Sequence, residues 1–177
     1  MASKNLIRFV DVSKSFGQQT VLKNINLAIN KGEITTIIGM SGVGKSVLLK
    51  HIIGLISPDS GEILYQDRPI SKLSRQEKSG LKKKFSYMFQ GTALFDSMTV
   101  FENIALPLKE KSGLSENTVQ RMVMDKMDQL DIREMSDKYP AQLSGGMKKR
   151  VALARALVTE PEIVLFDEPT TGLDPIR

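Results

Sequence analysis

The chain has 177 residues, of which 25 are Lys or Arg and 20 are Asp or Glu, so its formal net charge is +5. This length suits about one domain, and a composition that is 41% hydrophobic and 25% charged excludes an intrinsically disordered chain. The absence of cysteine and the single histidine exclude disulfides, thiolate metal sites and multi-histidine metal sites.

The N-terminal third is predicted to consist of strands. Residues 7–12 and 21–29 form two of them, joined by a turn at 15–19. In the second strand the odd-numbered positions, Lys23 included, are expected on the half-buried side. Residues 33–38 are rich in β-branched side chains and are followed by glycine, which predicts a buried strand that leads into a loop. No apolar run reaches the about 20 residues that span a bilayer, and no signal peptide is visible, so we expect a soluble, intracellular protein.

The next segment matches the phosphate-binding pattern G-x-x-x-x-G-K-[ST] and precedes a helix predicted over residues 45–56. Glycines let backbone N–H groups turn inward toward phosphate oxygens, and the helix N-terminus adds a positive dipole end. Lys45 is expected to bridge the β and γ phosphates, and Ser46 to ligate Mg²⁺. A glycine-rich turn with a surface lysine is the alternative, and the flanking strand and helix argue against it. The expected nucleotide contacts are Gly39, Met40, Ser41, Gly42, Val43, Gly44, Lys45, Ser46 and Val47.

The positive charge is local. Residues 72–84 hold six cations and one anion, a balance of +5, so the rest of the chain sums to zero. Ser74 and Glu77 have the spacing of a capping box, which predicts a short helix within this segment. We interpret 72–84 as a solvated face, with contact to anionic lipid headgroups as the weaker alternative.

The central part of the chain is predicted to be helical. Ser115 is placed to cap a helix with one apolar face, and a second helix is expected over residues 144–158. Residues 162–166 then form a short apolar strand that ends in Asp167 and Glu168. In an open parallel sheet the carboxyl ends of strands face the ligand crevice. Asp167 is therefore expected to hold Mg²⁺, and Glu168 to polarise the attacking water as a general base. The predicted apolar face comprises Val119, Met122, Val123, Met127 and Leu130.

The order of these motifs resembles the ATPase subunit of ABC transporters over the whole chain. After the phosphate loop come Gln90 behind a strand, the sequence Leu-Ser-Gly-Gly-Met at 143–147, the Asp-Glu pair, and Thr-Gly-Leu-Asp at 171–174. The resemblance implies an α/β P-loop NTPase of the ABC type, with a mixed sheet core, an antiparallel β subdomain and a helical signature subdomain. Residues 1–92 and 156–177 would form the nucleotide-binding core, and 93–155 the helical subdomain.

The resemblance also implies ATP hydrolysis in a head-to-tail homodimer with ATP and Mg²⁺ between the subunits. The catalytic residues would be Glu168, Lys45 and Gln90, and Gln90 would also contact Mg²⁺. Phe16 would stack on adenine, and Asp174 would lie in the loop that couples the two sites. Phe16 as a core aromatic and Gln90 as a strand-end polar residue remain open. The signature residues that would close over the partner's γ-phosphate are Ser144, Gly145 and Gly146.

Met147, where most ABC ATPases have glutamine, and the stretch 89–103 resemble the ATPases of MCE-type lipid transporters, which move phospholipid between bacterial membranes. That resemblance implies a place on the cytoplasmic face of the inner membrane, permease subunits docked near Ala93–Asn103, an MCE-type lipid-binding protein in the complex, and no nucleic acid. The apolar members of the docking stretch suit a groove, or they are ordinary core. Those members are Leu94, Phe95, Val100 and Phe101.

Two other classes of function stay open. An ABC-type ATPase acting on DNA or translation fits the motifs, but aromatic residues are only 6% and none lies among the cations at 82–84, so no stacking platform for bases is visible. A nucleotide-binding module with little turnover is the third reading. The sequence stops at Arg177, before the region in which the family carries its switch histidine, so weak activity of these residues alone is expected. His51 is interpreted as a helix-surface or packing residue.

Overall fold

The computed structural model describes residues 5–88, 91–110 and 113–167. Their contacts group the chain into two compact units, residues 1–83 and 84–177, and each unit is described by itself. Among the described helices, none is long and apolar enough to cross a bilayer.

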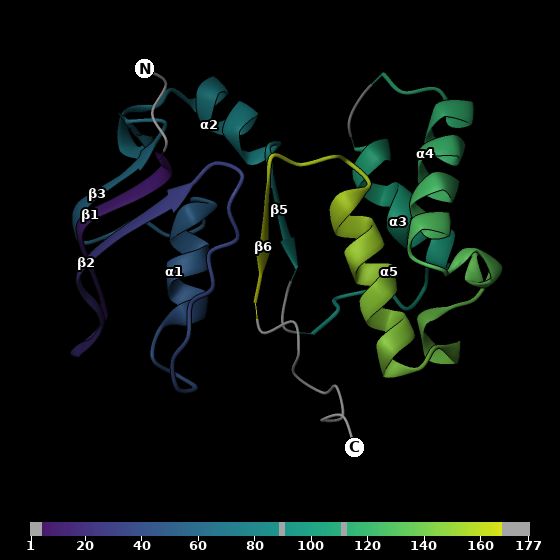
Figure 1. Cartoon of the computed structure of the whole chain (residues 1–177), viewed down its shortest axis with the longest axis horizontal. Coiled ribbons are helices and arrows are strands. Elements are labelled where there is room, and N and C mark those ends of the chain that lie inside the picture. The colour runs from purple at the N-terminus through teal and green to yellow at the C-terminus, as the bar shows by residue number, and fades with distance from the viewer. Residues whose placement is uncertain (1–4, 89–90, 111–112, 168–177) are drawn as a thin grey trace. The chain divides into compact units, whose positions relative to one another are not determined.

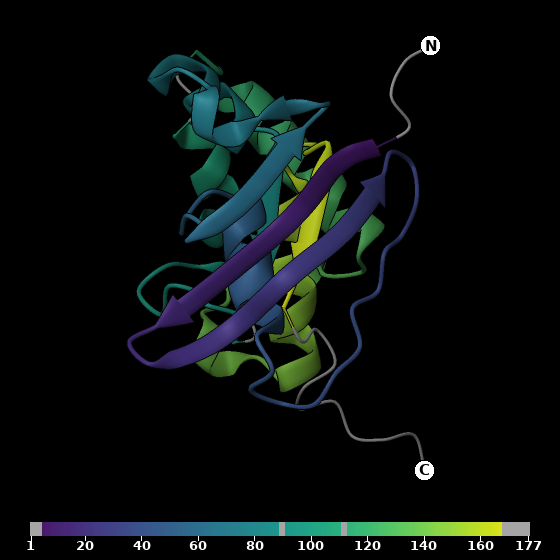
Figure 2. The same cartoon turned by 90° about the vertical axis from the view of Figure 1, so that its left-hand side faces the viewer.

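The first unit is built on an antiparallel sheet of strands β1 (Asn5–Phe16), β2 (Gln19–Asn30), β3 (Ser60–Tyr65) and β4 (Arg68–Pro69). The strand order is β2-β1-β3-β4, and β1 and β2 are the long pair in Figure 2. Ile7 and Phe9 of β1 face inward by strand alternation, and a register shift after Phe9 brings Val12 inward as well, so that all three are almost fully buried. The two predicted strands are confirmed and are longer than predicted, so the turn between them is limited to residues 17–18 of the predicted 15–19.

A bulge changes which residues of β2 face inward. The register shifts between the pairs Val12↔Ile25 and Lys14↔Leu22, and Asn24 between them has a φ of 47°. Because an extra residue reverses the alternation, Leu22 is buried and Lys23 is exposed. The predicted inward position of Lys23 is therefore wrong.

The segment 33–38 is an irregular loop, so the predicted buried strand is wrong. The side chains of Ile34 and Ile38 are 97% and 91% exposed, and no described strand pairs with the segment. A β-branched composition favours an extended backbone, but a strand forms only where a neighbour completes the hydrogen-bonded ladder.

Helix α1 (Lys45–Ile52) follows the glycine-rich loop and lies on one face of this sheet (Figure 2). Its buried residues include Leu48, Leu49 and Ile52. The helix ends four residues earlier than predicted because Gly54 adopts a φ of 69°, the left-handed conformation typical of a helix end.

The basic segment contains a 3₁₀ turn (Ile70–Lys72) and helix α2 (Arg75–Lys82). Ser74 and Glu77 form the predicted capping box, with each side chain bonded to the other residue's backbone N–H. Glu77 also pairs with Arg68 at 2.9 Å. These hydrogen bonds, above all those from Ser74, lower the pKa of Glu77 from its ordinary value of 4.5 to about 2.

Among its described residues, the second unit combines a parallel strand pair with three α-helices. Strands β5 (Phe85–Met88) and β6 (Ile163–Phe166) pair in parallel and lie side by side in Figure 1. The helices are α3 (Val100–Lys109), α4 (Glu116–Gln129) and α5 (Gly145–Leu157). Short 3₁₀ turns at Arg133–Met135 and Pro140–Gln142 join α4 to α5.

The apolar face predicted for the helix after Ser115 lies in the helical core of the second unit. Ser115 caps α4 by accepting a hydrogen bond from the N–H of Thr118, as expected. Ser144 caps α5 in the same way. The predicted face of α4 packs into one cluster with α3 and α5, and Val100 belongs to that cluster with no exposed surface. The fully enclosed members include Val100, Ile104, Val123, Met127, Val151 and Ala154.

Gly61 is expected to tolerate no side chain, whereas Gly80 is expected to accept one. A Cβ at Gly61 would lie 2.3 Å from the Asp11 carbonyl oxygen, at a φ of +81°. A Cβ at Gly80, inside α2, would meet nothing within 4 Å. In chemical denaturation, Gly61→Ala should lose several kcal/mol of unfolding free energy and Gly80→Ala should gain about 0.5–1 kcal/mol. Equal effects of the two substitutions would contradict this packing.

The lowered pKa of Glu77 predicts a pH dependence of stability. An acid whose folded pKa is depressed stabilises the fold above its unfolded pKa, and that contribution is lost as pH falls through the folded pKa. Between pH 4.5 and about 2, thermal unfolding of Glu77→Gln should therefore depend less steeply on pH than unfolding of the wild type. Glu116→Gln, on another helix, should keep the wild-type slope.

Candidate functional site

The glycine-rich loop ends directly at the N-terminus of α1. Gly44 is the N-cap residue, no side chain caps the helix, and the first turn contains no acid. The first backbone N–H groups of an α-helix have no partner within the helix, and the dipole there favours anions. This end of α1 therefore suits a phosphate group.

Gly44 is required by both conformation and packing. Its φ is +102°, and a Cβ would lie 2.8 Å from Cγ1 of Val21 on strand β2. Gly42 also has a left-handed backbone, with a φ of +80°. Glycine therefore avoids backbone strain at both positions, and at Gly44 it also avoids a clash with β2.

The Lys45 side chain folds back across the loop. Its ammonium donates to the carbonyl oxygens of Gly39 and Met40, each at 2.8 Å. Two loop carbonyls thus hold the cation beside the uncapped start of α1. The loop residues are largely exposed, and Met40 is 81% exposed. A cation, a helix N-terminus and an open loop together form the donor set that a polyphosphate needs.

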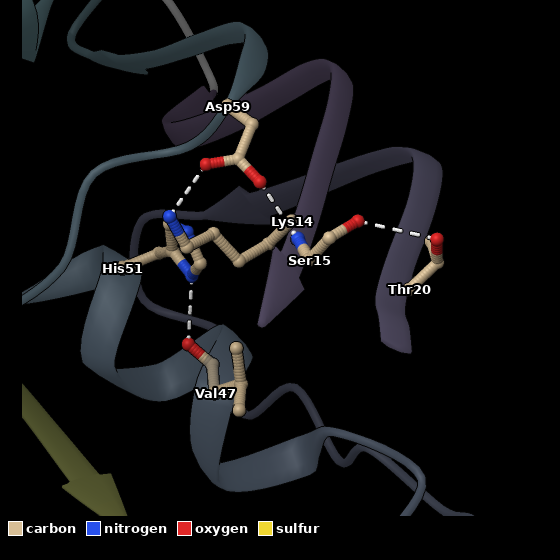
Figure 3. A network of polar contacts seen from close by, with 6 residues as sticks. All are labelled: Lys14, Ser15, Thr20, Val47, His51 and Asp59. Atoms are coloured by element: carbon tan, nitrogen blue, oxygen red, sulfur yellow. Dashed lines mark hydrogen bonds and ion pairs between the residues drawn. The ribbon is translucent and has the colours of Figure 1, made fainter. Parts of the chain in front are cut away.

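Phe16 lies at the tip of the β1–β2 hairpin and is 49% exposed, which excludes the core alternative. The Lys14 ammonium lies 5.5 Å from the centroid of its ring. Lys14 also forms an ion pair with Asp59 at 2.6 Å, and Asp59 accepts from the Ser15 N–H at 2.7 Å. These contacts lower the pKa of the Asp59 carboxyl, chiefly through the hydrogen bond from Lys14. The hairpin tip that carries Phe16 is thereby tied to residue 59 (Figure 3).

Of the two alternatives predicted for His51, a helix-surface residue and a packing residue, the structure shows a packing residue. Its side chain is 1% exposed, and its Nδ1 lies 2.8 Å from the Val47 carbonyl oxygen one turn earlier in α1. Because a carbonyl only accepts, Nδ1 carries the proton. Figure 3 shows the ring facing the side of the sheet from which Lys14 extends.

The signature residues form the exposed N-terminus of α5. The Ser144 hydroxyl accepts from the N–H of Met147 at 3.3 Å, and no acid lies in the first turn. A Cβ added to Gly145 or Gly146 would meet nothing within 4 Å. Nothing within the described chain therefore requires glycine here, although glycine in a helix costs about 1 kcal/mol relative to alanine. Met147 packs against the helical core.

Asp167 lies at the carboxyl end of β6 and is 7% exposed. Its Oδ2 accepts a hydrogen bond of 2.7 Å from the hydroxyl of Tyr87 on the neighbouring strand β5. Burial, followed by this interaction with the carboxylate, raises the pKa of Tyr87. Tyr87 therefore stays protonated and orients a carboxylate of the kind that Mg²⁺ prefers.

The loop between β5 and α3 is held from two helices. Asn103 of α3 is fully buried and bonds to both the N–H and the carbonyl of Phe95, at 2.8 and 3.1 Å. Arg155 of α5 donates to the carbonyl oxygens of Thr92 and Ala93, both at 2.8 Å. Burial lowers the pKa of Arg155. Both side chains thus hold a segment without regular secondary structure, Arg155 from 62 and 63 residues away and Asn103 from 8 residues away.

The same loop borders a groove in the second unit with a volume of about 380 Å³. Its lining is mainly apolar and includes Phe95, which is 49% exposed. Of the four apolar residues named for docking, Val100 is enclosed in the core, and Leu94 and Phe101 pack against that core. Of these four residues, only Phe95 lines the groove. Its other lining residues include Leu106, Pro107, Glu110, Ala152 and Arg155.

The residues of the predicted site are divided between the two units. The phosphate loop, Lys45, Ser46 and Phe16 belong to the first unit, and Asp167 and the signature residues to the second. Gln90, Glu168 and Asp174 lie outside the described residues. Within the described part of the chain, no group of three or more potential acidic or histidine ligands gathers as a metal centre.

Sequence reasoning missed Tyr87, Asn103 and Arg155. Tyr87 could have been found from the parallel pairing of β5 with β6, which sets Tyr87 opposite Leu165, two residues before Asp167. Asn103 and Arg155 each lie in an apolar helical pattern, and a polar residue there signals a buried hydrogen bond. No sequence pattern identifies the loop atoms to which Asn103 and Arg155 are hydrogen-bonded.

Residues 22–171 match the ABC transporter family. The intermembrane phospholipid transport system ATP-binding protein MlaF of Haemophilus influenzae is 40% identical over 174 residues, which cover 98% of this chain and 66% of that protein. MlaF of Escherichia coli K12 is 43% identical over 172 residues, or 97% of this chain and 64% of that protein. The chain thus spans slightly less than two thirds of these relatives.

Solved structures share the fold. The dimeric ATP-binding cassette MJ0796, in a post-hydrolysis state with ADP and Pi, has a TM-score of 0.83 and 33% identity, and the match covers 95% of this chain and 76% of that one. This likeness confirms the predicted ABC-type α/β fold, and the MlaF matches confirm the resemblance to ATPases of lipid transport systems. By both its sequence and its fold, this chain belongs to the ABC transporter family.

Proposed function

We propose that the full-length protein is the ATP-binding and ATP-hydrolysing subunit of a phospholipid transporter. The observation that carries ATP binding is the glycine loop, in which two backbone carbonyls hold the Lys45 ammonium beside the uncapped N-terminus of α1. The similarity to MlaF supports phospholipid as the transported substrate. Adenine would stack on exposed Phe16, and Lys45 would neutralise charge on the phosphates.

The proposed metal site combines Ser46, Gln90 and Asp167. Mg²⁺ takes hard oxygen ligands, and the hydroxyl of Ser46 and the carboxylate of Asp167 are of that kind. When bound, Mg²⁺ would offset charge on the β and γ phosphate oxygens. Tyr87 would keep the Asp167 carboxylate oriented through its 2.7 Å hydrogen bond. Glu168 would accept a proton from the attacking water, which Gln90 would orient.

The proposed working form is a head-to-tail homodimer. Gly145 and Gly146 have open space around them in the chain itself, and this supports a close approach by a second molecule. Ser144 and the bare N–H groups of these glycines would meet the γ-phosphate bound to the partner subunit. Asp174 would couple the two sites. The dimeric cassette MJ0796 supports this assembly.

The proposed partners are integral-membrane permease subunits and an MCE-type lipid-binding protein, with the ATPase peripheral on the cytoplasmic face of the inner membrane. The groove of about 380 Å³ with Phe95 at its edge supports permease docking near Ala93–Asn103. The division into a core (1–92 and 156–177) and a helical subdomain (93–155) stays a prediction. Slow turnover by the 177 residues alone also stays a prediction, so the experiments below use the full-length protein.

Lys45→Ala should weaken Mg²⁺-ATP binding at least tenfold, because the ammonium beside the phosphates is lost. Isothermal titration of the full-length protein measures this affinity. Lys50→Ala is the matched control, since Lys50 lies on the same helix and is exposed. Equal affinities of the two variants would contradict the proposed role of the loop.

Glu168→Gln should lower ATP hydrolysis at least a hundredfold and leave ATP binding intact, because the amide cannot accept the proton of water. With the copurifying permease in phospholipid vesicles, movement of fluorescent phospholipid should stop as well. Glu160→Gln, also close to β6, should retain both activities. Phospholipid movement that continues in Glu168→Gln would refute ATP-driven lipid transport. Hydrolysis in the wild type that is stimulated by DNA or ribosomes and not by the permease would favour the alternative class.

A further inference from the structure

Arg155 belongs to two features of the second unit. It lies in the last turn of α5, the helix whose first turn carries Gly145 and Gly146. Its side chain also lines the groove that borders the β5–α3 loop. The N-terminal end of α5 thus carries the signature glycines, and its C-terminal end contributes Arg155 to the groove.

The Arg155 guanidinium is hydrogen-bonded to the backbone of the β5–α3 loop. It donates through NH1 to the Ala93 carbonyl and through NH2 to the Thr92 carbonyl, each at 2.8 Å. Among the described residues, no carboxylate forms an ion pair with the Arg155 guanidinium. This includes Glu110, which lines the same groove. A planar guanidinium offers two N–H groups in a fixed fork, which a lysine ammonium lacks.

The loop needs such a brace at this position. Ala93 has a φ of 48°, a left-handed conformation that an alanine keeps only where its surroundings hold it. The next fixed point along the loop is Phe95, which Asn103 holds by two hydrogen bonds. Thr92 and Ala93 are therefore held from α5, and Phe95 is held from α3.

We propose that Arg155 is a positioning residue that makes the β5–α3 loop and the signature helix α5 move together when a partner occupies the groove. This inference rests on the proposed function and adds to it the route by which permease docking reaches the signature. A partner pressing on Phe95 and the groove floor displaces the loop. Arg155 passes that displacement to α5, and hence to the glycines at its N-terminus.

The test compares Arg155→Ala and Arg155→Lys in the full-length protein with its copurifying permease in phospholipid nanodiscs. Both variants should lose about tenfold of the permease-stimulated kcat, while KM for ATP and the permease-free rate stay within about twofold of wild type. Lysine should fail to rescue because one ammonium cannot hold two carbonyls in the geometry of the fork. Arg121→Ala on α4 is the control, since Arg121 is exposed and should behave as wild type.

Hydrogen exchange gives a readout that does not depend on turnover. Amides of residues 91–99 should exchange at least tenfold faster in Arg155→Ala than in Arg121→Ala, and those of α4 should not change. The inference is overturned if permease stimulation in Arg155→Ala equals that in Arg121→Ala, or if Arg155→Lys restores this stimulation. It is also overturned if the KM for ATP, the melting temperature and all ATPase rates of Arg155→Ala fall together. A wild type that the permease does not stimulate would instead overturn the proposed function.

Discussion

Binding a polyphosphate requires backbone N–H groups that the protein has not already used. At the start of α1 the chain places glycine at the N-cap, where no side chain caps the helix, and no acid in the first turn. That choice constrains the surrounding structure. Gly44 must sit against the Val21 side chain in a conformation that other residues avoid, and β2 leaves no room there for a Cβ on Gly44. The phosphate loop thus depends on the shape of the antiparallel sheet beside it.

Polar side chains do the corresponding work in the second unit. Tyr87, Asn103 and Arg155 are largely removed from solvent, and each is hydrogen-bonded to a partner outside its own helix or strand. A buried polar group that lost its partner would carry an unfavourable desolvation free energy, so each of these contacts enforces one local geometry. The apolar cluster of α3, α4 and α5 provides stability, whereas these three side chains determine where the irregular segments lie.

Local signals in the sequence predicted much of this structure. The predicted capping residues Ser74 and Ser115 act on neighbours three positions away, and each helix begins where its cap predicts. The failures are non-local. The segment 33–38 has the composition of a strand but lacks a pairing neighbour among the described residues. The bulge at Asn24 depends on how β2 meets β1, and the bonds of Arg155 join positions more than 60 residues apart. Composition and periodicity carry no information about such pairings.

The open space around Gly145 and Gly146 has a consequence for protein engineering. A stabilisation protocol that considers one chain by itself would replace both residues with alanine, since helix propensity favours the change and no atom of the chain opposes it. The resulting monomer would be more resistant to heat, and in the proposed dimer a methyl group would stand where the partner subunit approaches. At these two positions, selection for the proposed assembly and laboratory selection for thermal stability would therefore act in opposite directions.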